Sequence, residues 1–307
     1  MPLTLEIERT WLRTSCQLMG CSVELMVDGP SSLVPLAIAR LRALERVWTR
    51  FSPASELNRL HERRGQWVAV SPELFSALRW CDRLHRETGG LFDPTIREAL
   101  EAWGYDRTFR EIDCAERQPP ITPRSEHEAG FELDHDGRRV RLAEGVSIDL
   151  GGIGKGLGAD MVAAELISAG ARGVYACLGG DIHVAGDTPP GGWDVPLLHP
   201  VTGETFAQHR LAGGGLVMST VAIRRWDCGG VPAHHIIDPR VGAPALTDVV
   251  AVAVAARSSA RAEALAKAAI VAGSRAGRAM LERAAVKSWI VLADDVLTVD
   301  AVHAEAI

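Results

Sequence analysis

The chain has 307 residues, of which 47% are hydrophobic and 23% are charged, and its formal net charge is −6. These values are typical of a mildly acidic globular protein and exclude an intrinsically disordered chain or a fibrous repeat. Apolar runs stop well short of the roughly 18 residues that a membrane-spanning helix needs. The basic residues are too scattered to follow a nucleic-acid backbone. We therefore expect neither a membrane span nor a nucleic-acid partner.

Cysteine usage points to a reducing compartment. The six cysteines form no Cys-x-x-Cys pair and have no regular spacing, so we expect most of them to be buried thiols and not part of a disulfide scaffold. The segment from Met1 to Cys21 shows no basic leader followed by an apolar stretch. The sequence predicts a cytoplasmic protein.

The N-terminal half predicts strands followed by amphipathic helices. Ser31 or Ser32 can cap the first helix, and Ser71-Pro72 is a typical helix start. In chain order, the predicted elements are strands Leu3 to Arg13 and Cys21 to Val27, a helix with apolar residues from Leu41 to Phe51, and a helix from Ser71 to the stop at Gly89-Gly90.

The C-terminal half alternates helices and strands without a strict βαβ rhythm. The predicted elements are a hairpin from Phe131 to Leu142, a helix from the glycines at 151–158 to Gly170, strands Val174 to Leu178 and Val249 to Ala256, helices Ser258 to Val271 and Arg275 to Ala285, and strands Trp289 to Leu292 and Val296 to Val299. This order predicts an α+β fold with antiparallel-rich sheets flanked by helices. We expect one domain over residues 1–307. Two interleaved subdomains, with a polar connection near residues 105–130, are the alternative.

A glycine-rich segment from Asp149 to Asp160 is the densest local signal, because five glycines surround Lys155 just before a predicted helix. Such a segment lets backbone N–H groups approach an anion at a helix N-terminus. Neither the Walker nor the dinucleotide-binding spacing fits it. The alternative is a flexible turn between a strand and a helix.

Two further motifs carry polar side chains in turns. Residues Ala233 to Gly242 contain two histidines, Asp238 before proline and an arginine, and their spacing leaves metal binding and general-base catalysis open. Residues Thr88 to Thr95 contain Asp93 before proline, and a helix stop with an Asx turn explains this motif equally well.

In this order and at this spacing the motifs resemble the ApbE family, the FAD:protein FMN transferases. The segments from Asp149 to Asp160 and from His234 to Gly242 are the specific ones. The resemblance spans nearly the whole chain, and the other segments that carry it are Met19-Gly20, Phe51 to Asn58, Thr88 to Thr95, Trp103-Gly104, Leu178 to Asp181, Ser219-Thr220, Arg224 to Trp226 and the alanine-rich helix up to Gly273.

The resemblance implies an ApbE-like fold and transfer of the FMN moiety of FAD to a threonine or serine hydroxyl of a partner flavoprotein, with release of AMP. The chain has no Asp-x-x-Thr-Gly-Ala sequence of the kind that the family modifies, so we expect the acceptor to be a separate protein. A catalytically degenerate FAD-binding protein and an FAD pyrophosphatase that gives FMN and AMP are the alternative functions.

The resemblance also implies roles for individual residues. His235 is expected to be the general base or a phosphate ligand, and Lys267 a further catalytic cation. The residues implied to contact the cofactor are Met19, Phe51, Leu91, Phe92, Asp93, Asp149, Lys155, His235 and Asp238. The implied metal ligands are a backbone carbonyl at Gly152 and the carboxylate of Glu263.

The chain departs from the family pattern at the implied magnesium site. Glu263 stands where the family has aspartate, Lys267 where it has threonine, and Ala222 where many members have an acidic residue. The sequence therefore predicts weak or altered magnesium dependence, with Lys267 neutralising part of the phosphate charge and Glu263 holding that lysine or a loosely bound metal. The alternative is that Glu263 and Lys267 form an exposed ion pair one helical turn apart.

Overall fold

The structure is a computed structural model, and it describes residues 11–114 and 130–300. Its centre is a sheet in which every neighbouring pair of strands is antiparallel, in the order β1-β2-β6-β7-β10-β15-β16-β17. The strands are β1 (Leu12–Leu18), β2 (Cys21–Asp28), β6 (Gly173–Leu178), β7 (Asp181–Gly186), β10 (Gly214–Thr220), β15 (Ala251–Ala256), β16 (Lys287–Val291) and β17 (Val296–Val299).

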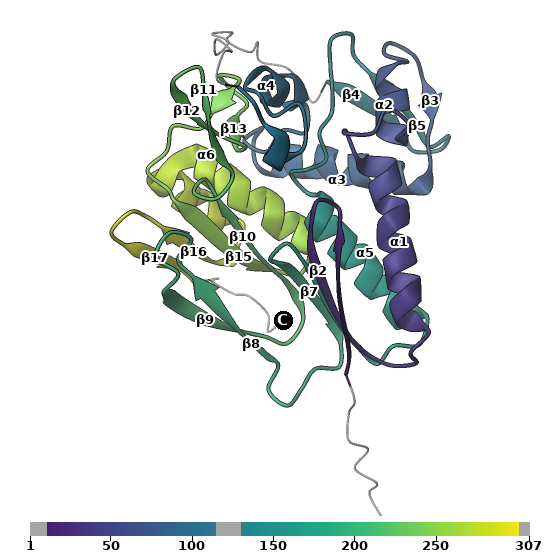
Figure 1. Cartoon of the computed structure of the whole chain (residues 1–307), viewed down its shortest axis with the longest axis vertical. Helices are drawn as coiled ribbons and strands as arrows, with labels where there is room; N and C mark the ends of the chain where they lie inside the picture. Colours follow the sequence, from purple (N-terminus) through teal and green to yellow (C-terminus); the bar gives the residue numbers. More distant parts are fainter. Residues whose placement is uncertain (1–10, 115–129, 301–307) are drawn as a thin grey trace, which may run out of the picture.

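Three long helices, α1 (Leu33–Trp48), α5 (Gly154–Ser168) and α6 (Ser259–Arg283), lie along one face of this sheet (Figure 1). Helix α5 packs on β6 and β7, α6 packs on β10 and β15, and α1 packs against α5. A hairpin of β8 (Trp193–Leu198) and β9 (Thr205–Leu211) covers part of the other face.

Strand β15 shows how the sequence produces these layers. All six of its residues are buried, which is expected of a central strand covered on both sides. Val252 and Val254 pack into the core beneath the helices, whereas Ala253 and Ala255 pack with the β8–β9 hairpin on the opposite face. Because successive side chains point to opposite faces of a strand, a continuous apolar run fits this position and an alternating one would not.

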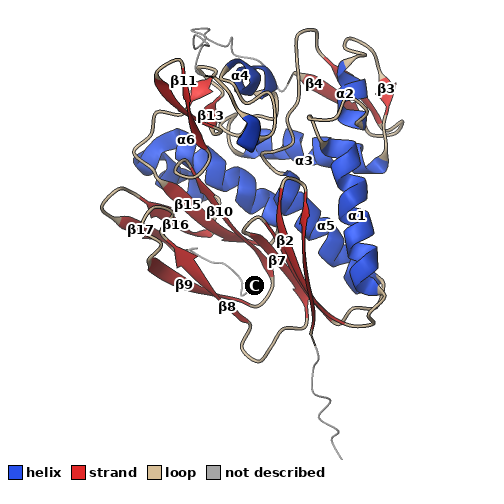
Figure 2. Ribbon diagram, in the orientation of Figure 1, coloured by secondary structure: helices blue, strands red, loops and turns tan. Residues whose placement is uncertain are grey.

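A second group of elements, all short except for one helix of 16 residues, lies beyond α5 and α6 (Figure 2). Leu78 from this group shares one hydrophobic core with Leu265 of α6 and with β15. The elements are α2 (Glu56–His61), α3 (Pro72–Glu87), α4 (Arg97–Ala102), the 3₁₀ turn η1 (Phe109–Glu111), a sheet of β3 (Val68–Ala69), β5 (Arg139–Leu142) and β4 (Phe131–Asp134), and the pairs β11 (Arg225–Cys228) with β12 (Val231–His234) and β13 (Ile237–Asp238) with β14 (Ala243–Pro244).

The mixed fold with antiparallel sheets and flanking helices confirms the predicted class. Most of the first predicted strand, Leu3 to Arg13, lies outside the described residues, and the observed strand continues to Leu18. The polar connection near residues 105–130 also lies largely outside them, and the one-domain organisation stays a prediction. The sequence does not predict α2 and α4, because a helix of six residues is too short to show a periodic pattern.

Helix ends follow local rules in some places and not in others. The Ser71 side chain caps α3 as expected, accepting a hydrogen bond from the Leu74 N–H. The cap expected at Ser32 is wrong, because that residue already has helical backbone angles and makes no side-chain capping bond. Gly273, with φ of 79°, interrupts α6 between the two helices predicted there, since glycine adopts this left-handed conformation without steric cost.

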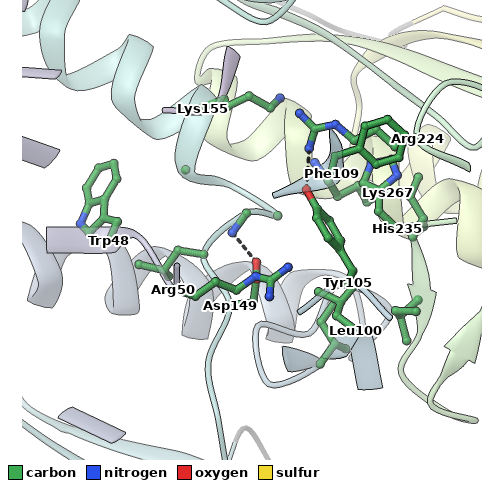
Figure 3. A pocket seen from close by; sticks show the side chains of 18 of the residues that line it. Trp48, Arg50, Leu100, Tyr105, Phe109, Asp149, Lys155, Arg224, His235 and Lys267 are labelled. Carbon is green, nitrogen blue, oxygen red and sulfur yellow. Dashed lines mark hydrogen bonds and ion pairs between the residues drawn. The ribbon is translucent and has the colours of Figure 1, made fainter. Parts of the chain in front are cut away.

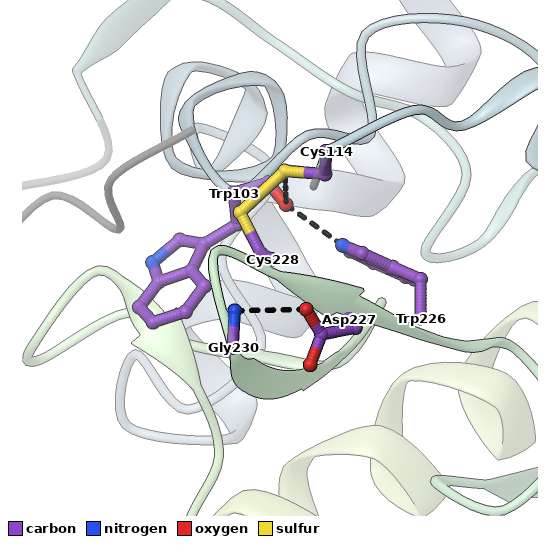
Figure 4. Close-up of a disulfide and its surroundings, with 6 residues drawn as sticks. All are labelled: Trp103, Cys114, Trp226, Asp227, Cys228 and Gly230. Atoms are coloured by element: carbon purple, nitrogen blue, oxygen red, sulfur yellow. Dashed lines mark hydrogen bonds between the residues drawn. A yellow bond between two sulfur atoms is a disulfide. The ribbon is translucent and has the colours of Figure 1, made fainter. Parts of the chain in front are cut away.

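Most of the cysteines are free thiols as expected, but only Cys81 of the four free ones is buried, and two cysteines are not free. Cys114 and Cys228 form a disulfide with their Cα atoms 4.7 Å apart, and it joins the segment after η1 to the end of β11 (Figure 4). The other four cysteines are free. Spacing could not reveal a pair separated by 114 residues. In the described ranges, no helix combines the length and the hydropathy needed to span a membrane.

Candidate functional site

A pocket of about 380 Å³ opens between the helices on the central sheet and the second group of elements. Its wall combines segments that are far apart in the sequence. They are the β1–β2 turn, residues 45–51 at the end of α1, residues 91–109, the glycine-rich segment 149–155, Arg224, residues 235–237, and Lys267 and Val271 of α6.

One side of the pocket is built around Arg50. Its guanidinium lies 4.3 Å from the ring centre of Phe51 and 4.6 Å from that of Tyr105. Its Nε is 2.6 Å from Oδ2 of Asp149, and both residues are only 8% exposed. The other oxygen of Asp149 accepts a hydrogen bond from the Gly151 N–H at 2.5 Å. Asp149 is therefore a fixed, paired carboxylate that anchors the start of the glycine-rich segment.

The β1–β2 turn brings Met19 to the pocket. It joins two strands through two residues, Met19 and Gly20, whose φ angles are 53° and 68°. Such a pair of positive φ angles belongs to the tight turn that matches the twist of a hairpin. A positive φ is unfavourable for a residue with a long side chain, so the fold holds Met19 against the pocket at some conformational cost.

The Thr88 to Thr95 motif contributes both an Asx turn and part of the pocket wall. Oδ1 of Asp93 accepts hydrogen bonds from the N–H and the hydroxyl of Thr95, each at 2.7 Å. Phe92 is 4% exposed, and its ring lies so close to Gly152 that an added Cβ there would be 2.8 Å from it. Glycine at 152 therefore lets the ring approach the backbone of the glycine-rich segment.

Two lysines that line the pocket and two carboxylates behind them form a largely buried cluster. Lys155 contacts Asp181, and its Nζ is 3.3 Å from Oε1 of Glu263. The Lys267 Nζ lies 2.8 Å from the same Glu263 oxygen. Oε2 of Glu263 accepts the N–H of Gly156 at 2.9 Å. The alternative of an exposed surface pair is therefore wrong, because the Glu263 side chain is 0% exposed and that of Lys267 only 16%.

Burial and pairing shift the pKa values of this cluster. Burial lowers the pKa of Lys155, but Asp181 and Glu263 outweigh it and the pKa is raised overall. Burial raises the pKa of Asp181 to about 6, against the opposing effect of Lys155. Burial also lowers the pKa of Lys267, which Glu263 only partly offsets. The pKa of Glu263 is lowered, because Lys155 and Lys267 outweigh its burial.

His235 lies at the same end of the pocket as these lysines (Figure 3). Burial, followed by the charges of Arg224 and Lys267, lowers its pKa well below the ordinary value, so the ring is neutral. Its Nδ1 is buried and makes no hydrogen bond within the described part of the chain. A neutral imidazole that lines a cavity can accept a proton or hydrogen-bond a ligand.

The sequence pattern shared by the ApbE family matches residues 19–290 of this chain. The chain belongs to the ApbE family. It is 30% identical to an FAD:protein FMN transferase of Rhodobacter capsulatus over 270 residues, which are 84% of this chain and 50% of that protein. It is 27% identical to the protein of the same name from Vibrio cholerae over 254 residues, 78% of this chain and 73% of that protein. The chain thus spans half the length of the Rhodobacter relative.

Solved ApbE structures share the fold. The ApbE protein of Thermotoga maritima superposes with a TM-score of 0.84 and 23% identity, covering 94% of this chain and 97% of that one. The Pseudomonas stutzeri flavinyl transferase ApbE superposes with a TM-score of 0.81 and 20% identity, covering 98% and 97%. At these identities the superpositions show the ApbE fold alone.

The ApbE pocket contains most of the residues that the resemblance singled out. The predicted residues that line it are Met19, Phe51, Leu91, Phe92, Asp93, Asp149, Gly152, Lys155, His235 and Lys267. Glu263 lies behind the wall. Asp238 does not line the pocket, and its two oxygens pair with the Arg240 side chain at 2.9 and 2.7 Å. The roles of all these residues stay predictions.

Three pocket residues with clear contacts are not predicted from the sequence. Arg50 precedes the predicted Phe51, Tyr105 follows the Trp103-Gly104 motif, and Arg224 lies in a segment that carried the resemblance without a role. Arg224 donates to the Tyr105 hydroxyl at 3.4 Å (Figure 3). Only their position within or next to a motif could have pointed to them.

The residues at the implied ApbE magnesium site do not fit that ion. Both oxygens of Glu263 already accept hydrogen bonds, and an ammonium group stands where the family has a hydroxyl. Mg²⁺ needs oxygen ligands in near-octahedral geometry, and a lysine ammonium has only donors. Across residues 11–114 and 130–300, no group of three or more histidine, cysteine, aspartate and glutamate side chains is arranged to hold a metal.

Proposed function

We propose that this chain transfers the FMN moiety of FAD to a threonine or serine hydroxyl of a separate flavoprotein and releases AMP. The observation that supports this proposal most is that one pocket gathers ten of the residues implied by the resemblance from six separate stretches of the chain. The names of the relatives from Rhodobacter capsulatus and Vibrio cholerae describe this activity.

The two ends of the pocket suit the two parts of such a donor. Aromatic and apolar side chains, among them Phe51, Phe92 and Tyr105, line one side and suit a flat flavin ring. Lys155, Lys267 and Arg224 line the other end and suit a diphosphate. We assign the flavin to the aromatic side and the diphosphate to the cationic end.

The transfer requires an oxygen of the acceptor to attack the phosphorus of the FMN half. A new P–O bond forms to the acceptor, the P–O bond to the AMP half breaks, and the acceptor hydroxyl loses its proton. We assign that proton to Nδ1 of His235. The imidazole is neutral, and its Nδ1 has no other hydrogen-bond partner in the described structure. The negative charge of the bound diphosphate offsets the cations that depress the pKa of His235, and so strengthens it as a base.

A degenerate FAD-binding protein is the second candidate, and the misfit at the magnesium site favours it. The test is to incubate the protein with FAD and a peptide carrying the acceptor motif, with magnesium and with chelator, while following AMP release and peptide mass. A peptide that gains the mass of an FMN moiety supports the transferase. FAD binding without AMP supports the degenerate protein, and AMP without modified peptide supports an FAD pyrophosphatase.

A cytoplasmic location stays a prediction. The disulfide between Cys114 and Cys228 is evidence against it, since reducing compartments keep most thiols free.

A further inference from the structure

Lysine is rare in this chain, which makes its placement informative. The 33 lysine and arginine residues include only three lysines, Lys155, Lys267 and Lys287. Two of these three meet at one oxygen of Glu263 and line the pocket. Arginine supplies nearly all the other basic side chains of the chain. Two of the rare lysines nevertheless lie beside Glu263, which the resemblance implies to be a metal ligand. An ammonium is a point charge with three rotatable donors, whereas guanidinium is a wide planar fork.

The cluster is layered, with anions behind and cations in front. Asp181 and Glu263 are 1% and 0% exposed, and neither lines the pocket. The side chains of Lys155 and Lys267 are 20% and 16% exposed and do line it. The carboxylates thus hold the ammonium groups in position and stay out of a ligand's reach. Unpaired, such deeply buried charges would be very unfavourable.

The pocket side of this cluster has an excess of positive charge. The two carboxylates balance the two lysines, and Arg224 adds a third cation close enough to affect the pKa of Lys155. Figure 3 shows Lys155, Arg224 and Lys267 on the same side of the pocket as His235. The buried, unpartnered Nδ1 of His235 is an independent sign that this corner is built for a polar ligand.

We propose that Lys155, Lys267 and Arg224 take the place of the divalent cation in this chain, so that the diphosphate of FAD binds without magnesium. The inference rests on the proposed function. Fixed ammonium and guanidinium groups form charge-assisted hydrogen bonds to phosphate oxygens. A divalent ion would have to displace Lys155 and Lys267 from Glu263 before it could reach that carboxylate.

The first experiment measures equilibrium binding of FAD, ADP and riboflavin to the full chain by calorimetry, in magnesium and in EDTA. The proposal predicts dissociation constants for FAD and ADP that agree within about threefold between the two conditions. FAD binding that requires magnesium would overturn the inference and leave the proposed function standing. Failure to bind FAD in either condition would overturn both.

The second experiment uses Lys267→Met, which keeps the length of the side chain and removes its charge. In EDTA, FAD and ADP should bind about tenfold or more weakly, while riboflavin, which has no phosphate, binds as it does to the parent. Lys287→Met is the matched control, because Lys287 lies outside the pocket and pairs with Asp300 at 3.2 Å. Its binding should match the parent.

Lys267→Arg guards against a folding defect in Lys267→Met, since it keeps the positive charge. It should retain the magnesium-independent binding within a few-fold. A loss equal to that of Lys267→Met, with an unchanged melting temperature in both variants, would contradict a role for charge at this position.

Restoring the family's residues should restore a need for metal. The double variant Glu263→Asp with Lys267→Thr removes the internal cation and supplies a carboxylate and a hydroxyl. Magnesium should then strengthen its FAD binding by about tenfold or more relative to EDTA. If the double variant and the parent respond to magnesium alike, the ammonium groups do not replace the ion.

Discussion

The glycine-rich segment offers a direct test of why its glycines are there, because Gly154 and Gly156 differ sharply in their surroundings. A Cβ built on Gly156 would lie 2.5 Å from the carbonyl oxygen of Ser259 and 2.8 Å from the N–H nitrogen of Ala260. Both atoms belong to the backbone of the first turn of α6, which cannot rotate away. A Cβ on Gly154 would meet nothing within 4 Å.

The expected cost of Gly156→Ala follows from these distances. Overpacking a core with one methyl group costs about 1–3 kcal/mol, and contacts with backbone place this site at the upper end. Alanine gains about 1 kcal/mol over glycine from helix propensity, so the net loss is about 2 kcal/mol. Moving α6 away would also break the 2.9 Å hydrogen bond from the Gly156 N–H to Glu263.

The assay is urea unfolding of the parent, Gly156→Ala and the matched control Gly154→Ala. Gly156→Ala should lose about 2 kcal/mol of unfolding free energy, whereas Gly154→Ala should be unchanged or gain up to about 1 kcal/mol. Equal midpoints for the two variants would refute the reasoning, because they would show that α5 and α6 are not held at this separation.

Three further predictions concern the pocket and its support. His235→Ala should keep its melting temperature and FAD affinity but lose transfer by about 100-fold or more, and early melting or an unchanged rate would show that the assigned role is wrong. Arg50→Met should cost about 3–5 kcal/mol in urea unfolding, because it leaves Asp149 buried without its cation; adding Asp149→Asn should restore much of the loss if the buried charge is the cause. Burial and nearby arginines lower the pKa of His61 to about 3, so the unfolded chain takes up a proton near pH 6.5 that the folded chain does not. The stability from His61 is complete above pH 6.5 and falls by about 1.4 kcal/mol per pH unit below it, and unfolding of the parent and His61→Gln between about pH 7 and pH 5 should show a shallower slope for the variant.

Local sequence determined those parts of the molecule whose structure depends on near neighbours. The alternation of Val23, Leu25 and Val27 predicts β2, and all three side chains are 0% exposed. Ser71 caps α3 through an atom three residues away. The hairpin predicted from Phe131 to Leu142 is observed as β4 and β5. Each of these features depends on residues only a few positions apart, so the local sequence is enough to predict it.

The motif order determined the family and most of the pocket wall, since it reflects which segments the fold brings together. It could not reveal the partners of those segments. Asp149 was predicted to contact the nucleotide, and the structure shows that its oxygens are engaged by Arg50 and Gly151. Arg50, the cation that pairs with Asp149, lies about a hundred residues earlier in the chain. Sequence spacing does not predict contacts between residues so far apart.

Only the tertiary structure decided the state of the charged groups. Glu263 and Lys267 are four residues apart on a helix, a spacing that suits an exposed ion pair as well as a buried one. Packing of α6 against α5 buries Glu263 completely and adds Lys155 as its second partner. Burial and the identity of distant neighbours set the energy of a charge, and both depend on how the whole chain folds. The Cys114–Cys228 disulfide has the same origin, because the fold brings together two cysteines that the sequence separates by 114 residues.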